Sequence, residues 1–182
     1  MKRGEWKKYP SVTLKESILG IIGFGKIGKA IAKRAVSFGM EVVVCDIRKI
    51  TNKSLDKYGV QIKPFDEVLA KSDFVSINCD LNPSSTNIIG SNELLLMKKN
   101  AILINAARGE MIDETALINA LKNKIIEGAA LDVFEKEPLS IDSSLRKMSN
   151  CLISAHNSNA SPAVFDFIHR KTIENVIKGL KK

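Results

Sequence analysis

The chain has few aromatic side chains and no long apolar run. Aromatic residues make up 5% of the 182 positions, and the lysines and arginines are scattered rather than interleaved with aromatics. This pattern is not typical of a nucleic-acid-binding surface, although the net charge is +8. We therefore expect a lysine-rich solvated surface that attracts small anions, and no nucleic-acid partner. No stretch approaches the roughly 20 apolar residues of a membrane span, so we expect no membrane segment.

Cysteine is also scarce, with three residues at Cys45, Cys79 and Cys151. The three are odd in number, widely spaced, and each lies in or beside an apolar run. We expect them to be small, buried, reduced thiols rather than disulfide partners or metal ligands. The first ten residues are charged and lead into no apolar stretch, which does not fit a secretory signal peptide. These features predict a cytoplasmic protein without a metal.

Short apolar runs alternate with amphipathic ones along the whole chain. The apolar runs predict strands at 18–23, 41–46, 74–78, 101–104, 127–133 and 151–154. The amphipathic runs predict helices at 26–39, 65–72, 91–99, 113–123 and from Ser161-Pro162 onward. Alternating strands and helices with continuously apolar strands predict an α/β fold: a single domain with a Rossmann-type, doubly wound parallel sheet covered on both faces.

The first strand leads into the segment GFGKIG, with glycines at Gly23, Gly25 and Gly28. A G-x-G-x-x-G pattern gains meaning when it follows a strand and opens a helix, as it does here. The first glycine permits a tight turn, the second lets the backbone approach a pyrophosphate, and the third lets helix pack on strand. The free N–H groups of the helix start, including those of Lys26 and Ile27, would then face phosphates.

The second predicted strand ends at Asp46. A carboxylate at this place can accept hydrogen bonds from an adenosine ribose and would repel a 2′-phosphate, which favours NAD over NADP as the cofactor. Arg48 nearby weakens that inference. The alternative interpretation is a glycine turn needed only for packing, with Asp46 as a cap.

Four charged or polar residues lie at the ends of later strands: Arg108, Asp132, Glu137 and His156. Taken singly, Arg108 could be a surface charge, Asp132 a turn cap, Glu137 one of a surface pair with Glu135, and His156 a solvated loop residue. In a parallel sheet, however, ligands bind outside the carboxyl ends of the strands. An arginine, a glutamate and a histidine would then surround the place where a nicotinamide ring would lie.

Several segments together resemble the NAD-binding domain of the D-2-hydroxyacid dehydrogenases, with phosphoglycerate dehydrogenase-like members the most similar. They are GIIGFGKIGKAIA, LINAARGEMIDETALINAL, GAALDVFEKEPL and SAHNSNAS, and the likeness extends from about Trp6 to the last helix. The resemblance implies an NAD-dependent oxidoreductase that transfers hydride between nicotinamide and a small 2-hydroxy or 2-oxo acid, with 3-phosphoglycerate as one candidate. A methyltransferase interpretation of the glycine turn gives no reason for the Arg, Glu and His set.

The resemblance also implies roles for individual residues. Arg108 would bind the substrate carboxylate and 2-oxygen, His156 would exchange the proton, and Glu137 would hold the imidazole. Asp132 would contact the nicotinamide carboxamide. The loops expected to line the nicotinamide side contain Ala106, Ala107, Asn157, Ser158 and Asn159. His169, on the last helix beside its apolar stripe, is expected to be structural.

One departure from the family concerns its second, substrate-binding domain, which is built mostly from residues before the glycine motif. Here 22 residues precede Gly23. We therefore interpret 1–182 as an NAD-binding domain with the substrate domain largely absent, residues 1–16 as a remnant of the interdomain connection and 161–182 as a C-terminal helix. Two hypotheses remain: a dehydrogenase whose isolated chain is weakly active or inactive, and a truncated, non-catalytic NAD-binding or NAD-sensing module. The apolar stripe of the last helix predicts self-association to a homodimer.

Overall fold

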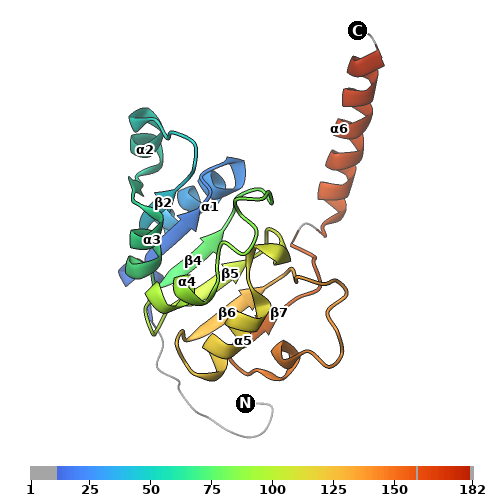
Figure 1. Cartoon of the computed structure of the whole chain (residues 1–182). Helices are drawn as coiled ribbons and strands as arrows, with labels where there is room; N and C mark the ends of the chain where they lie inside the picture. The colour runs from blue at the N-terminus through green and yellow to red at the C-terminus, as the bar shows by residue number, and fades with distance from the viewer. Residues whose placement is uncertain (1–11, 159, 181–182) are drawn as a thin grey trace, which may run out of the picture.

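The computed structural model describes residues 12–158 and 160–180, and these form one parallel sheet flanked by helices (Figure 1). The seven strands follow the order β3-β2-β1-β4-β5-β6-β7, and every neighbouring pair is parallel. Their bounds are β1 Ile18–Ile22, β2 Glu41–Cys45, β3 Gln61–Ile62, β4 Phe74–Ile77, β5 Ile102–Asn105, β6 Gly128–Leu131 and β7 Cys151–Ile153. The strand order reverses between β1 and β4, so the sheet is doubly wound, as predicted.

The five predicted helices all form, with ends that differ by up to three residues. The α-helices are α1 Lys26–Ser37, α2 Asn52–Tyr58, α3 Phe65–Lys71, α4 Ser91–Leu96, α5 Glu114–Lys122 and α6 Pro162–Leu180. Short 3₁₀ turns occupy η1 Leu14–Glu16, η2 Gly109–Met111 and η3 Ser144–Lys147. The sequence pattern did not predict α2 and β3. The helix α2 buries no residue and therefore shows no apolar periodicity; its start is capped by Thr51, which accepts a hydrogen bond from the Ser54 N–H.

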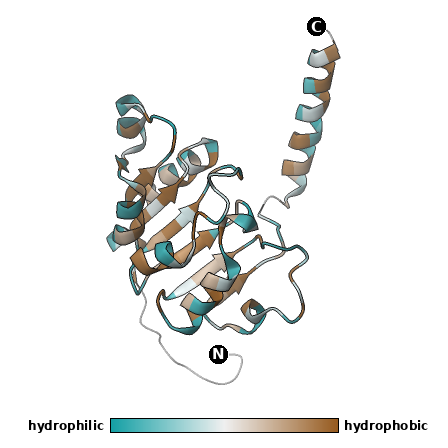
Figure 2. Ribbon diagram, in the orientation of Figure 1, coloured by the Kyte–Doolittle hydropathy of each residue, from teal (hydrophilic) through white to brown (hydrophobic). Residues whose placement is uncertain are grey.

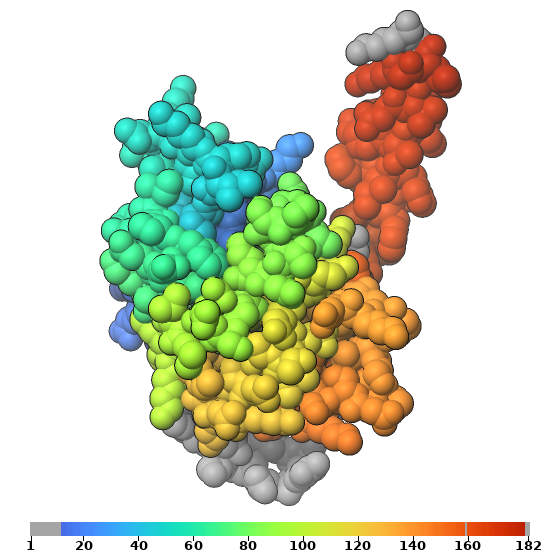
Figure 3. Space-filling view, in the orientation of Figure 1, coloured from blue at the N-terminus to red at the C-terminus, as the bar shows by residue number. Residues whose placement is uncertain are grey.

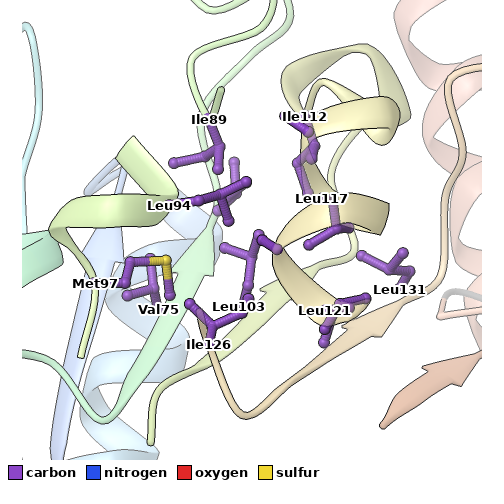
Figure 4. Close-up of a cluster of buried hydrophobic side chains, with 14 of the residues drawn as sticks. Val75, Ile89, Leu94, Met97, Leu103, Ile112, Leu117, Leu121, Ile126 and Leu131 are labelled. Atoms are coloured by element: carbon purple, nitrogen blue, oxygen red, sulfur yellow. The ribbon is translucent and has the colours of Figure 1, made fainter. Parts of the chain in front are cut away.

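Two apolar clusters lie on opposite faces of the sheet. Neighbouring residues of β1 belong to different clusters. Ile22 belongs to the cluster that contains side chains of α3, α4 and α5, and Ile21 belongs to the cluster that contains side chains of α1. Since successive side chains of a strand point to opposite faces, this strand is buried on both. Figure 4 shows the larger cluster, where Leu103 of β5 meets Leu117 and Leu121 of α5. The hydropathy colouring in Figure 2 shows the same apolar sheet interior beneath polar helix surfaces.

On the face of the sheet opposite the larger cluster, the strands beyond β4 are not fully covered by other residues. Leu152 of β7 is 73% exposed, and Ile102 and Ile104 of β5 are only partly buried. The continuous apolar runs predicted strands covered on both faces, and within the described residues this holds fully only for the centre of the sheet.

The last helix, α6, projects away from the sheet (Figures 1 and 3). None of its residues is buried, and its large apolar side chains are exposed. They are Val164, Phe165, Phe167, Ile168, Ile173, Val176, Ile177 and Leu180. His169 is exposed as well, and its expected structural role stays a prediction. No helix of the described residues is long and apolar enough to cross a membrane. The predicted interdomain remnant at 1–16 falls mostly outside the described residues.

Candidate functional site

The glycine turn after β1 is packed tightly on its inner side. Gly23 has φ +91°, a left-handed conformation that favours glycine. A Cβ at Gly23 would overlap the backbone of residues 78–79 at the end of β4, and a Cβ at Gly28 would overlap the carbonyl oxygen of Gly23. Both positions therefore need glycine so that β1, β4 and α1 can meet at this corner.

The outer side of the same turn is open. Gly25 is the N-cap of α1, and a Cβ there would make only an ordinary contact with the Arg48 guanidinium. The first N–H groups of a helix, here beginning with Lys26 and Ile27, have no acceptor inside the helix and can donate to phosphate oxygens. Gly25 and Lys26 border a hollow of about 630 Å³ at the carboxyl ends of β1, β2 and β4, which is large enough for an adenosine.

Asp46 ties the end of β2 to the glycine turn. One carboxylate oxygen accepts a hydrogen bond from the Phe24 N–H at 2.8 Å, and the other accepts from the Arg48 N–H at 2.8 Å. The Arg48 guanidinium adds two bonds, from Nε and Nη2, each 3.1 Å long. Burial by itself raises the pKa of Asp46, but the bonds from Arg48 and Phe24 outweigh it and the pKa is lowered. The side chain is 5% exposed, so the carboxylate expected to meet a ribose is already covered by Arg48.

The three cysteines are free thiols, as expected, but they are partly buried where the sequence predicted buried thiols. Cys45 and Cys79 line the 630 Å³ hollow. Burial raises the pKa of Cys45 to about 12 and that of Cys151 to about 11, and it also raises the pKa of Cys79. All three are therefore neutral thiols at physiological pH.

Asp132, directly after β6, organises the loop that follows β7. Its carboxylate accepts hydrogen bonds from the Ser154 hydroxyl, the Asn157 N–H at 3.0 Å and the Ser158 N–H at 2.8 Å. Its backbone carbonyl accepts from the His156 N–H at 2.8 Å. Burial by itself raises the pKa of Asp132, but these bonds lower it to about 2, so the group is charged at neutral pH. The contacts hold His156 in a left-handed conformation, at φ +51°.

His156 and Glu137 form a hydrogen-bonded pair. The distance from His156 Nδ1 to Glu137 Oε2 is 2.8 Å, and Glu137 Oε1 accepts from the Phe134 N–H at 3.1 Å. The bonds from His156 and Phe134 lower the pKa of Glu137. With Nδ1 on the carboxylate, the opposite nitrogen, Nε2, is the one available to another molecule. The two side chains are 44% and 37% exposed, and they line a second hollow of about 650 Å³.

Arg108 follows β5, the strand next to β6. Its guanidinium is exposed and donates from Nη1 to the Ala107 carbonyl at 2.6 Å. The turn is held by Asn105, which is 1% exposed. The Asn105 side chain donates to the Arg108 carbonyl at 2.8 Å and accepts from the Ala107 N–H at 3.0 Å. Sequence reasoning missed Asn105; its only signal was being the first polar residue after an apolar strand.

Gly109 brings the Arg108 turn against the segment that leads to Glu137. A Cβ at Gly109 would overlap the backbone of Phe134 and Glu135, so the two loops pack without space for a side chain. Within the described residues, however, no hydrogen bond or ion pair joins Arg108 to Glu137 or His156. The structure thus pairs two members of the expected set and places the third on the neighbouring loop.

The remaining expected residues are distributed along the same edge of the sheet. Ala106 is exposed and Ala107 is partly buried, both in the turn after β5. Asn157 and Ser158 are fixed to Asp132, and Asn159 lies outside the described residues. Among the described residues no group of three or more His, Cys, Asp or Glu side chains could hold a metal ion.

The sequence of residues 1–158 matches the family model described as the D-isomer specific 2-hydroxyacid dehydrogenase, NAD binding domain. The chain belongs to this family. The family assignment confirms the resemblance drawn from the sequence, and NAD is the cofactor that the domain binds.

Curated members of the 2-hydroxyacid dehydrogenase family are clearly similar to the chain. Glyoxylate reductase from Thermococcus litoralis is 38% identical over 190 residues, which cover 100% of this chain and 57% of that protein. D-3-phosphoglycerate dehydrogenase from Methanocaldococcus jannaschii is 41% identical over 185 residues, which cover 98% of this chain and 35% of that protein. The chain thus spans just over half the length of some curated relatives and about a third of others.

Solved structures of the family share the fold. A glyoxylate reductase from Paecilomyes thermophila matches with a TM-score of 0.91 and 33% identity, over 100% of this chain and 55% of that one. The NAD-complexed D-isomer specific 2-hydroxyacid dehydrogenase from Lactobacillus delbrueckii matches with a TM-score of 0.86 and 30% identity, over 96% and 57% of the two chains. The sheet described above is therefore the Rossmann-type domain of these enzymes.

Proposed function

We propose that the chain carries the cofactor-binding and proton-transfer part of an NAD-dependent oxidoreductase that acts on a small 2-hydroxy or 2-oxo acid. The observation that carries this proposal is the His156–Glu137 pair. His156 lies on the loop after β7, where Asp132 holds it, and Glu137 lies on the segment after β6; both are at the same edge of the sheet as the glycine turn. An imidazole fixed at one nitrogen and accessible at the other is the arrangement that general acid–base catalysis requires.

The residues of the glycine turn fit a dinucleotide. The inner side excludes any Cβ at Gly28, while the outer side at Gly25 is bordered only by Arg48. The pyrophosphate would lie over the N–H groups of Lys26 and Ile27 at the start of α1. When bound, NAD supplies the hydride acceptor or donor of the reaction. The other expected cofactor contacts within the described residues, Asp132 and the loops at 106–107 and 157–158, border the opposite half of the same edge.

Three side chains would then bind the substrate and transfer its proton. In the direction of reduction, His156 gives a proton from Nε2 to the 2-oxygen, and in oxidation it takes that proton back. Glu137, which is charged, accepts from Nδ1 and so orients the ring and favours its protonated form. Arg108 has further N–H donors besides the one on the Ala107 carbonyl, and a planar guanidinium can hold a carboxylate and the adjacent oxygen together.

The relatives suggest which substrates to try first: glyoxylate, hydroxypyruvate and the 2-oxo acid derived from 3-phosphoglycerate. We would measure NADH binding by its fluorescence and NADH oxidation by its absorbance. Both assays use the 182-residue chain and a fusion that adds the unmatched part of the Thermococcus litoralis glyoxylate reductase. We expect NADH binding by both proteins, and turnover chiefly by the fusion, where positioning of the substrate is complete.

Variants separate catalysis from cofactor binding. His156→Gln and Arg108→Ala should each lower kcat/KM of the fusion by at least roughly 100-fold, the scale of losing one preorganised group. NADH affinity should change little. Arg108→Lys should recover little activity, since an ammonium cannot replace the planar fork. Unchanged turnover in His156→Gln would refute the assigned chemistry. NADH binding without turnover by the fusion would favour the non-catalytic NAD-binding or NAD-sensing alternative.

A further inference from the structure

A hydrogen bond from a distant carboxylate holds the segment 134–137, which leads from β6 to Glu137. The Glu135 N–H donates to Glu114 Oε1 at 2.6 Å, and Glu114 is the first residue of α5. Within the described residues this is the one hydrogen bond between segment 134–137 and residues 105–114. Glu114 therefore connects the loop after β6 to the turn after β5 and the helix that follows it.

Glu114 is not needed to cap α5. The helix cap is Asp113, whose carboxylate accepts a hydrogen bond from the Ala116 N–H at 2.9 Å. The Glu114 carboxylate is half-buried and accepts from the Glu135 N–H instead. Burial raises the pKa of Glu114, although the bond from Glu135 opposes this rise. A carboxylate withdrawn from water at such a cost is more typical of a functional site than of the surface of a helix.

Close packing supports the same contact. Gly109, directly after Arg108, lies against the peptide group between Phe134 and Glu135, which a Cβ on Gly109 would overlap. Glu114 binds the N–H of that same peptide group. The turn after β5 and the start of α5 thus contact one peptide group of the loop after β6, the first by packing and the second by a hydrogen bond. These two contacts set the distance between the turn after β5 and the loop after β6.

We propose that Glu114 is a positioning residue for the reaction. Its carboxylate holds the Glu135 N–H, and through that backbone it keeps Glu137 at a fixed distance from the Arg108 turn. The reaction requires this because Arg108 and His156 act on adjacent atoms of one substrate, and no hydrogen bond or ion pair joins them in the described chain. Glu137 holds the His156 ring at 2.8 Å, so a shift of its segment moves the imidazole relative to the guanidinium.

The inference rests on the proposed function, and three substitutions of Glu114 in the fusion enzyme test it. Glu114→Ala removes the acceptor and should lower kcat by roughly 10- to 100-fold, since a displacement of about 1 Å in the reacting groups has an effect of this size. NADH affinity should change little, because Glu114 does not border the adenosine hollow. Glu114→Gln keeps an acceptor oxygen at the same reach and should retain most of kcat. Glu114→Asp keeps the charge but has a shorter side chain, so it should lose about as much as Glu114→Ala.

The order of the three variants separates positioning from a merely structural role. If Glu114 served only as a negative charge at the start of α5, Glu114→Asp would be active and Glu114→Gln would not, since a helix N-terminus favours an acidic side chain. The positioning role requires the reverse order. It also requires the KM for the 2-oxo acid to rise less than kcat falls, because Arg108 can still bind the carboxylate.

Amide hydrogen exchange in the 182-residue chain gives a readout that does not depend on activity. The Glu135 N–H should exchange at least about 10-fold faster in Glu114→Ala and Glu114→Asp than in the wild type, because its bond is lost. In Glu114→Gln it should exchange nearly as slowly as in the wild type. The N–H groups of Asn157 and Ser158 are held by Asp132 and should exchange alike in all four proteins.

The matched control is Glu127→Ala, because Glu127 is an exposed glutamate just before β6, at the end of the strand remote from the site. It should leave kcat and the exchange of the Glu135 N–H unchanged. Should Glu114→Ala fail to fold, the comparison of Glu114→Gln with Glu114→Asp decides the question. Activity in Glu114→Asp but not in Glu114→Gln would overturn the proposal, as would a wild-type kcat in Glu114→Ala. A wild-type fusion that binds NADH without turnover would refute the proposed function, and with it any catalytic purpose of the contact.

Discussion

Replacing Asp132 by asparagine tests whether this buried carboxylate holds the loop that carries His156. The substitution keeps the shape of the side chain but removes its charge. It also puts an NH₂ group where an oxygen now accepts, so at least one of the donors Ser154, Asn157 and Ser158 loses its acceptor. The side chain of Asp132 belongs to a residue that is only 7% exposed, so water does not readily replace the lost bond.

The size of the effect follows from the pKa. The pKa of Asp132 is lowered from 3.8 to about 2, which corresponds to about 2 kcal/mol in favour of the charged form in the folded protein. An unsatisfied buried donor costs about 1 to 3 kcal/mol by itself. We therefore expect Asp132→Asn to lose about 2 to 3 kcal/mol at neutral pH. For a chain of this size that is a fall in Tm of about 4 to 12 °C.

The pH dependence of the stability difference between wild type and Asp132→Asn is a more specific test. A carboxylate with a lowered folded-state pKa stabilises the protein above its unfolded pKa, and this contribution is lost as the pH falls through the folded value. The difference between wild type and Asp132→Asn should therefore be full at neutral pH and shrink as the pH falls from about 4 toward 2. Thermal and urea unfolding across this range measure it.

The control for this experiment is Asp142→Asn, because Asp142 is an exposed loop residue. It should unfold like the wild type at every pH. If Asp132→Asn melts together with the wild type at neutral pH, or if their difference stays constant down to the lowest pH, the argument that Asp132 anchors the His156 loop is wrong.

Three further predictions concern other parts of the chain. Gly28→Ala should lower the free energy of unfolding by about 1 to 3 kcal/mol and weaken NADH binding, because its Cβ would overlap the Gly23 carbonyl; urea unfolding and NADH fluorescence test both effects. Asn105→Ala should lower kcat of the fusion enzyme more than it lowers NADH affinity, since Asn105 holds the Arg108 turn and does not border the adenosine hollow; equal losses would argue against this role. The exposed apolar side chains of α6 should drive self-association to a dimer, and Phe165→Glu should weaken it; a wild-type monomer in sedimentation at micromolar concentrations would count against this proposal.

Much of the fold followed from patterns that are local in the sequence. Every predicted strand and helix formed, because apolar runs and 3.6-residue periodicity report burial one segment at a time. The glycine turn could also be predicted from the sequence. Gly23 and Gly28 are required because a Cβ at either position would overlap nearby backbone, and the G-x-G-x-x-G pattern of one strand–turn–helix unit records this requirement. The elements that were missed, α2 and β3, contain no fully buried residue and so leave only a weak apolar pattern to detect.

Only the tertiary structure decided which partners the polar residues have. The sequence placed Asp46, Asp132, Glu137 and His156 at strand ends, but their hydrogen-bond partners depend on which strands are neighbours and in what register. Asp132 meets residues 154–158 because β6 pairs with β7. The pairing of Arg48 with Asp46 is a matter of side-chain conformation over the glycine turn.

The helix α6 also shows the difference between what the sequence determines and what only the tertiary structure decides. Its sequence determined that it is a helix with an apolar stripe, and the structure shows that nothing in the described chain covers that stripe. Periodicity records that a face needs a partner, because apolar surface is unfavourable in water. It does not record where that partner comes from, since contacts between distant segments depend on how the whole chain packs and on what else is bound.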